Sequence, residues 1–296
     1  MKIAIATAVS AIALAVVASP AFAGPKVEIR SAVARVSVVV EDRSDIAVEV
    51  EQGSSALPRI EVTRRGDEVR IDGGLGRRGG MFRGGNNRIR DCNNGRSGGL
   101  PGEGASVQVR DLGRINVSDA PLILVRVPRN VEVDAAGAIY GSIGRGAQSV
   151  ELGHGGCGRW DVANVDGPLS LAIGGSGDIR AGTSRALDVS IGGSGSVAAG
   201  ATRAVEVAIG GSGDVSVARI DGPLQVAIGG SGDVDVRTGN APKVDISIAG
   251  SGDVNFGGVA GDVDVSIVGG GDVTIARATG SVSRSILGGG DVRIGN

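Results

Sequence analysis

The sequence predicts an all-β protein, a parallel β-helix or β-solenoid with coils of 18 to 20 residues and two main strands in each coil. Three observations predict this fold. A Gly-Gly-Ser-Gly-Asp turn recurs along the C-terminal half of the chain, and aliphatic residues alternate with polar ones on both sides of it. The 296 residues also include 54 glycines but only three Phe, one Tyr and one Trp, which is unlike an ordinary globular domain.

The repeat is clearest at the residue that follows the last glycine of each turn. Successive copies of this position lie 18 to 20 residues apart. They are Asp178, Ser196, Asp214, Asp233, Asp253, Asp272 and Asp291. A short, fixed period of this kind is typical of solenoids, whose coils stack on one another. The alignment gives seven clear coils and an earlier, degenerate coil over residues 150–162.

One strand precedes each turn and a second follows it. Val205, Val207 and Ile209 precede one turn, for example, and Val215 and Val217 follow it. Apolar residues at every second position share one face of a strand, so the two strands of a coil enclose one core. Stacking in register would pair each strand in parallel with its equivalent in the next coil. We expect the turn glycines to supply corners with positive φ.

The last coil departs from this pattern. Its first strand carries Arg284 at a position where the other coils have Val or Ile. A charge at this position discourages unwanted pairing of an exposed sheet edge, so we expect Arg284 to help cap the end of the stack.

Residues 1–23 have the pattern of a secretory signal peptide. Lys2 precedes a long apolar run, and a small-x-small site at residues 21–23 predicts cleavage between Ala23 and Gly24. No later apolar stretch approaches the ~20 residues needed to cross a bilayer as a helix. We therefore expect an exported protein without a membrane span, located in the periplasm, at the cell surface or outside the cell.

The remainder, residues 24–296, is predicted to be a single β-solenoid domain. Residues 24–74 alternate as N-terminal strands, residues 105–149 form irregular first coils, and residues 150–296 form the regular coils. Residues 75–104 are rich in Gly, Arg and Asn, and are predicted to be a long flexible loop. Its arginines are Arg77, Arg78, Arg83, Arg88, Arg90 and Arg96.

The chain resembles the head GIN domain family of auto-transporter adhesins. The resemblance rests on the alternation over residues 33–50, the strand pair over 60–71, the strands around Pro128, and the Gly-Ser-Gly-Asp-Val turns from 175–179 onward. It covers most of the chain after the signal peptide. It implies an exported β-solenoid with an adhesive role.

The column of aspartates allows two interpretations. Stacked coils would align Asp214, Asp233, Asp253, Asp272 and Asp291, and carboxylates this close repel unless something offsets their charge. Calcium is one solution, since the turn is similar to the repeat of calcium-binding β-rolls, although the aspartate is displaced by one residue. The alternative, which we favour, is that each aspartate accepts N–H bonds of its own turn and that no metal is bound.

Three further residues are candidates for chemistry. Cys92 and Cys157 are predicted to form a disulfide, because exported proteins rarely keep free thiols. His154, the only histidine, lies on the Ile173 column and is expected to fill the core with Trp160. A nucleophilic pair of Cys157 and His154 is disfavoured, because the alternation sends their side chains to opposite faces. No catalytic residue is therefore assigned.

The arginines of residues 77–96 could bind an anionic polysaccharide, lipopolysaccharide or nucleic acid, or simply be solvated. Phe82 is the only aromatic residue among them, so a base-stacking platform is missing. The chain as a whole has a net charge of −2. A nucleic-acid partner is therefore not expected.

The sequence favours a non-enzymatic binding protein, an adhesin or a surface or periplasmic binding protein that recognises a surface polysaccharide or a protein partner. One alternative is a carbohydrate-active β-helix enzyme, although such enzymes need long loops with clustered Asp, Lys and Arg. The other is a structural scaffold that polymerises by end-to-end self-association.

Overall fold

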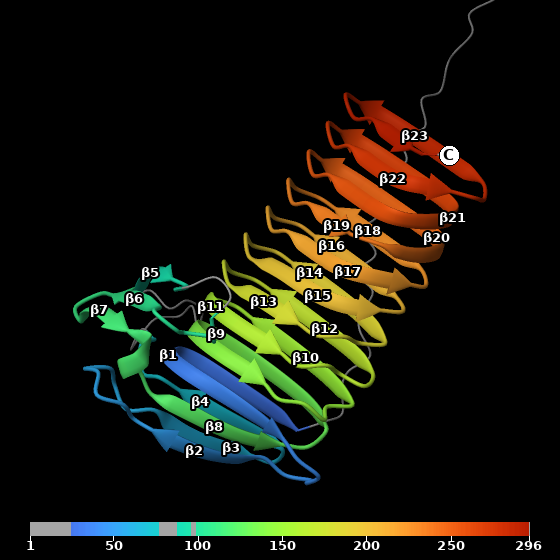
Figure 1. The fold of residues 1–296 in the computed structure, drawn as a ribbon. Helices are drawn as coiled ribbons and strands as arrows, with labels where there is room; N and C mark the ends of the chain where they lie inside the picture. Colours follow the sequence, from blue (N-terminus) through green and yellow to red (C-terminus); the bar gives the residue numbers. More distant parts are fainter. Residues whose placement is uncertain (1–24, 77–87, 96–98, 296) are drawn as a thin grey trace, which may run out of the picture.

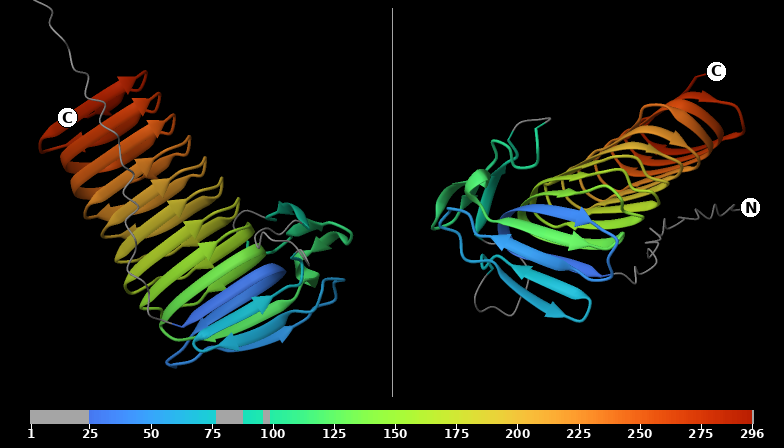
Figure 2. Two further views of the ribbon diagram at one scale, coloured as in Figure 1. Left: turned by 180° about the vertical axis from the view of Figure 1, so that it is seen from behind. Right: turned by 60° about the horizontal axis from the view of Figure 1, so that its bottom comes forward.

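The computed structural model describes residues 25–76, 88–95 and 99–295. The regular secondary structure of the described residues is nearly all β-strand, and the strands stack in parallel as a β-solenoid of about nine turns. The predicted fold class is confirmed. Figures 1 and 2 show the solenoid as a rod, with a small separate sheet beside its N-terminal end.

Each regular coil contributes one strand to each of two sheets. The strand pairs are β10 (Ser149–His154) and β11 (Cys157–Val162), β12 (Pro168–Ile173) and β13 (Asp178–Ala181), β14 (Ala186–Ile191) and β15 (Ser196–Thr202), β16 (Val205–Ile209) and β17 (Val215–Asp221), and β18 (Leu224–Ile228) and β19 (Val234–Val236). The last coils comprise β20 (Gly239–Gly250), β21 (Val254–Gly269), β22 (Val273–Ala278), β23 (Val282–Gly288) and β24 (Val292–Ile294).

The registers agree with the sequence alignment. Val207 pairs with Val189 on one side and with Val226 on the other, which keeps the apolar column continuous. In the degenerate coil, Val150 pairs with Leu169 and Trp160 with Ile179, as predicted. Burial of each aliphatic side chain contributes ~1.5–3 kcal/mol, so the stack gains stability from every added coil.

The turn glycines are needed for a reason other than the predicted one. In the turns at 192–195, 210–213 and 229–232, the structure gives no glycine a positive φ. A Cβ atom at Gly213 would instead overlap the carbonyl oxygen of Gly195, and one at Gly232 would overlap that of Gly213. The expectation of positive φ is therefore wrong for these turns. Glycine is required because consecutive coils bring their backbones into contact there.

The first strand of the sequence lies inside the stack. β1 (Lys26–Val40) pairs in parallel with β9 (Asn130–Ile143) along most of its length, and on its other side with β4 (Glu68–Asp72) and β8 (Leu122–Val127). Two antiparallel strands then cover this end: β2 (Ala47–Glu51) pairs with β8, and β3 (Glu61–Arg65) pairs with β4. The N-terminal end of the solenoid is thus capped.

The region predicted as loop and irregular coils contains a second sheet. β5 (Ile89–Asn93), β6 (Ser106–Val109) and β7 (Gly113–Asn116) are antiparallel, and a 3-10 turn, η1 (Val117–Asp119), follows. Residues 106–116 therefore do not begin the coils, and residues 89–93 are a strand rather than loop. Their apolar face is buried in a separate cluster with Val33, Ala138 and Tyr140, on the outside of the solenoid.

The close approach at the corners can be tested within one turn. A Cβ atom at Gly271 would overlap the carbonyl oxygen of Gly252, whereas one at Gly270 meets nothing within 4 Å. We expect Gly271→Ala to lower the free energy of unfolding by ~1–3 kcal/mol in urea denaturation. Gly270→Ala should change it by less than about 0.5 kcal/mol. Equal losses in the two variants would show that the corner is not sterically constrained.

Candidate functional site

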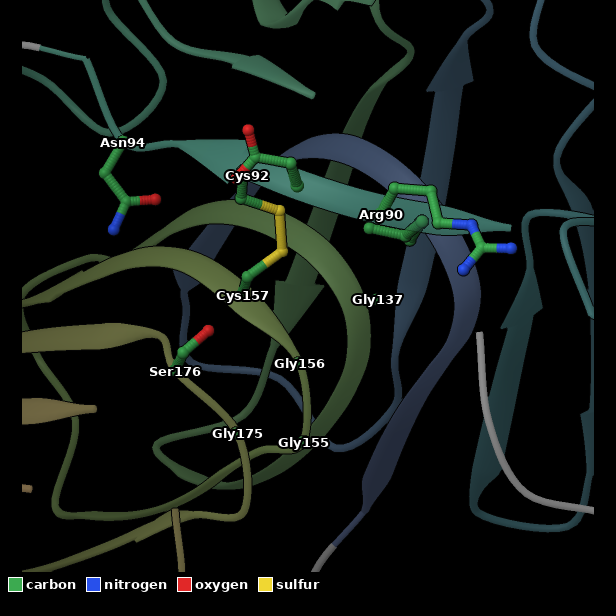
Figure 3. A pocket seen from close by; sticks show the side chains of 11 residues that line it. Arg90, Cys92, Asn94, Gly137, Gly155, Gly156, Cys157, Gly175 and Ser176 are labelled. Atoms are coloured by element: carbon green, nitrogen blue, oxygen red, sulfur yellow. A yellow bond between two sulfur atoms is a disulfide. The ribbon is translucent and has the colours of Figure 1, made fainter. Parts of the chain in front are cut away.

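A cleft of about 400 Å³ lies between the side sheet and the corners of the first coils. Figure 3 shows β5 running above the glycine-rich turns, with Cys92 and Cys157 joined between them. The cleft is lined by Ile89, Arg90, Asp91, Cys92 and Asn94 from β5 and its end, and by Gly137, Gly155, Gly156, Cys157, Gly175 and Ser176 from the corners. Backbone groups and short polar side chains therefore line most of its wall.

Buried residues of the solenoid hold the side sheet in place. Tyr140 projects outward from β9, is 1% exposed, and donates a hydrogen bond from its hydroxyl to the carbonyl oxygen of Asn93 at 3.2 Å. Burial raises the pKa of Tyr140 to about 12. Arg159, which is also buried, donates from Nη2 to the carbonyl oxygen of Gly99. The cleft consequently has one wall on the rigid solenoid and the other on a sheet anchored to it.

The structure brings Cys92 and Cys157 together as a disulfide, with their Cα atoms 6.3 Å apart. Cys157 stands in the turn slot that Ser176 occupies one coil later, so its side chain points outward toward β5. The pair links segments that lie 65 residues apart in sequence. A second link follows beside it, because Asn94 donates from Nδ2 to Asp178 Oδ2 at 2.9 Å.

The aspartate column forms a ladder of hydrogen bonds between coils. The backbone N–H of Asp233 donates to Asp214 Oδ1 at 3.2 Å, that of Asp253 to Asp233 Oδ1 at 2.9 Å, and that of Asp272 to Asp253 Oδ1 at 2.8 Å. Asp291 donates in the same way to Asp272 Oδ1 at 2.9 Å. The carboxylates therefore bond to the following coil rather than mainly to their own turns.

This geometry gives the carboxylates a structural role. One oxygen of each carboxylate is directed at a backbone donor, which offsets part of the repulsion along the column. Within residues 25–76, 88–95 and 99–295, no three His, Cys, Asp or Glu side chains converge in the manner of a metal site. Calcium at Asp214, Asp233, Asp253 and Asp272 stays an untested alternative.

His154 and Trp160 lie in the solenoid core, 1% and 0% exposed. Two glycines make room for them, since a Cβ atom at Gly177 would overlap the His154 ring and one at Gly141 would overlap the Trp160 indole. Burial lowers the pKa of His154 to about 4, so the ring is neutral near pH 7. The position expected from the sequence agrees with the structure, and Cys157 lies outside this core.

Several of the sequence predictions concern residues outside the described part. The cleavage site at Ala23 and Gly24 is one, and Arg77, Arg78, Arg83 and Arg96 of the arginine-rich segment are others. Of the remaining two arginines, Arg90 lines the cleft, and Arg88 lies 3.6 Å from Asp111 through Nη2 and Oδ2. In the described residues, no helix is long and apolar enough to cross a membrane.

Fold and cleft together define a β-solenoid with a lateral cleft. Residues 200–296 match the model of a family described as "Putative auto-transporter adhesin, head GIN domain". The resemblance drawn from the sequence is thus confirmed for the C-terminal third of the chain, the part from β16 to β24 together with the end of β15. A search of the curated proteins found no match.

Three solved structures are similar to this chain over most of its length. A putative adhesin from Parabacteroides distasonis is 14% identical, with a TM-score of 0.47, 90% of this chain covered and 91% of that one. A putative lipid binding protein from the same organism is 14% identical, with a TM-score of 0.43 and coverages of 92% and 93%. A putative cell adhesion protein from Clostridium sporogenes is 8% identical, with a TM-score of 0.22 and 92% of both chains covered.

The burial of His154 predicts a pH dependence of stability. Its pKa is about 4 in the folded chain and near 6.5 when unfolded, so the unfolded chain binds the extra proton first as pH falls. Stability should be full above pH 6.5 and should decline between pH 6.5 and pH 4. His154→Leu, which matches the apolar column, should flatten the dependence of melting temperature on pH over this range. Parallel pH profiles for the two proteins would contradict the assignment.

The ladder predicts how Asp253 responds to substitution. Asp253→Asn keeps an Oδ1 acceptor and removes one like charge, so the free energy of unfolding should change by less than about 0.5 kcal/mol. Asp253→Ala removes the acceptor for Asp272 and should cost about 1 kcal/mol. Urea denaturation of EDTA-treated protein would measure both changes in the free energy of unfolding. A melting temperature that rises with calcium in the parent chain but not in Asp253→Asn would support the metal alternative instead.

Proposed function

We propose that this chain is an exported, non-enzymatic adhesin that binds a surface polysaccharide in the cleft between β5 and the glycine corners. The observation that carries the proposal is the cleft itself. Its volume of about 400 Å³ is within the range of small-ligand sites, and its walls are held by Tyr140, by Arg159 and by the Cys92–Cys157 link. A preorganised site of this kind loses little entropy on binding.

The chemistry of the walls suits a hydroxyl-rich ligand. Gly155, Gly156 and Gly175 are exposed or partly exposed and present backbone rather than side chains to the cleft, whereas Gly137 is buried. Asn94 and Ser176 add neutral donors and acceptors, while Arg90 and Asp91 add one charge of each sign. Sugar hydroxyls both donate and accept hydrogen bonds, so a neutral or weakly charged glycan matches this mixed wall better than a strongly anionic polymer does.

The family description supports the location and the class. It names an auto-transporter adhesin. Adhesins act at the cell surface, which accords with the export signal predicted over residues 1–23. We propose that a protein partner is the second candidate ligand and that the disulfide is formed in the exported protein.

The test measures binding of residues 24–296 to an array of purified bacterial and host polysaccharides and to whole cells. Ser176→Trp should fill the cleft and weaken binding by about tenfold or more, a loss of at least ~1.4 kcal/mol. Ser212→Trp is the matched control, because Ser212 occupies the same exposed turn slot two coils further along, away from the cleft. Circular dichroism should show both variants folded.

Three outcomes would overturn the proposal. The chain could bind none of the polysaccharides or cells, or Ser176→Trp and Ser212→Trp could bind as well as the parent. Release of oligosaccharides from a polysaccharide during incubation would favour a carbohydrate-active enzyme instead.

A further inference from the structure

The two ends of the solenoid differ in the strands that form their outer edges. At the N-terminal end, β2 and β3 lie antiparallel across the stack, and β3 presents an exposed edge with Glu61, Arg64 and Arg65. Arg64 also donates to the carbonyl oxygen of Ile46, which ties β3 to the segment before β2. Charged edge strands of this kind resist pairing with another chain.

The C-terminal end lacks such a cover in the described residues. All seven residues of β23 are exposed, and Val282, Ile286 and Leu287 are 40%, 41% and 72% exposed. Two of the equivalent positions one coil earlier are buried: Val263 pairs with Val282, and Ile267, only 1% exposed, pairs with Ile286. Val268, which pairs with Leu287, is itself 40% exposed. Val282 and Ile286 therefore belong to the core column and are exposed because no further coil of the described residues lies on them, whereas Leu287 lies on the outer face of the sheet.

Arg284 reduces this exposure only in part. From the middle of β23 it crosses the end of the core, and Nη1 donates to the carbonyl oxygen of Val292 on β24 at 3.3 Å. The predicted capping by Arg284 thus has a structural counterpart. In the described residues β23 pairs with β21 alone, so the polar backbone groups on its outer edge face away from the stack.

We propose that a second copy of this chain docks on this end, C-terminal end to C-terminal end, in a closed two-fold dimer. A two-fold axis perpendicular to both sheets would place β23 antiparallel to β23 of the other copy and β24 antiparallel to the other β24. Both sheets would then continue across the interface. Head-to-tail addition would instead pair β23 with the outer edge of β3, where Glu61, Arg64 and Arg65 are exposed and oppose pairing. The assembly therefore stops at two copies.

Charge complementarity on β24 favours this partner. Asp291 and Arg293 are two residues apart and flank Val292; within one chain, Arg293 Nη2 lies 3.0 Å from Asp291 Oδ2 and Nη1 lies 3.5 Å from Asp272 Oδ2. Antiparallel pairing centred on Val292 places Asp291 of each copy opposite Arg293 of the other. The pairing thus forms two equivalent contacts between opposite charges, as an isologous interface requires.

The dimer has a consequence for binding. Each solenoid of about nine turns extends roughly 43 Å at ~4.8 Å per turn. Joining the C-terminal ends turns the two N-terminal ends, with their side sheets and clefts, outward in opposite directions. Two sites that face in opposite directions on one rigid particle can link two ligand-bearing surfaces, rather than engage one surface together. The dimer itself does not depend on the identity of that ligand.

Sedimentation velocity and light scattering over a wide concentration range test the proposal without any ligand. The mass should rise with concentration and stop at two chains. Ile286→Lys should raise the dissociation constant about tenfold or more, because it places a charge in the apolar contact between the two copies. Val62→Lys is the matched control, since Val62 is 40% exposed on β3, the edge strand at the other end of the molecule; its dissociation constant should equal that of the parent.

A charge exchange provides an independent check. Arg293→Asp alone should weaken the dimer, and the double variant Asp291→Arg, Arg293→Asp should recover it, because each charge again meets its opposite across the two-fold axis. Circular dichroism and melting temperature establish that each variant is folded. A monomer at every concentration, a mass that grows beyond two chains, or a dimer unaffected by both Ile286→Lys and Arg293→Asp would overturn the proposal.

Discussion

In-register parallel pairing of consecutive coils is the interaction on which the rest of this structure depends. In the regular coils, each strand pairs with a strand 18 to 20 residues away in the sequence. That pairing aligns like residues into columns: valines over valines, glycines over glycines and aspartates over aspartates. A column of valines is favourable because each one packs on the next. Columns of glycine and aspartate need another explanation, because alignment brings backbones close together in one case and like charges close together in the other.

Glycine is needed at the corners because there is no space for a side chain. The coils are close enough at the Gly-Gly-Ser-Gly corners that a Cβ atom on one coil would overlap the carbonyl oxygen of the coil before it. The aspartate carboxylates need a hydrogen-bond donor to offset their mutual repulsion, and the backbone N–H of the following coil supplies it. Both columns follow from stacking geometry. The repeated turn is therefore explained chiefly by the packing of the coils. The cleft, in contrast, lies where Cys157 replaces the turn serine and the side sheet adjoins the coils.

The sequence predicted the periodic part well because periodicity itself carries the register. Aligning Val150 with Leu169 and Trp160 with Ile179 required only the spacing of the turns, and both pairings are present. The N-terminal half offers no such period. Nothing in the alternation of Val107 and Val109 distinguishes a coil from a separate antiparallel sheet, and nothing local indicates that β1 lies between β4, β8 and β9. The cleft depends on both of these long-range arrangements. Tyr140, the side chain that anchors the sheet, could have attracted notice only as the single tyrosine of the chain.

The same stacking that stabilises the rod also leaves its ends exposed, because the strands of a terminal coil have a neighbouring coil on one side only. This chain treats its two ends differently. Near the N-terminus it uses irregular sequence, β2 and β3, to cover the edge with antiparallel strands and charges. At the other end the repeat runs on into β23, where one residue of the core column is an arginine and its neighbours Val282 and Ile286 keep their apolar character. Because Arg284 reaches across to β24, the end is partly covered but retains its exposed apolar side chains. The difference between the ends is what makes a closed pair of solenoids physically reasonable and an open filament unfavourable.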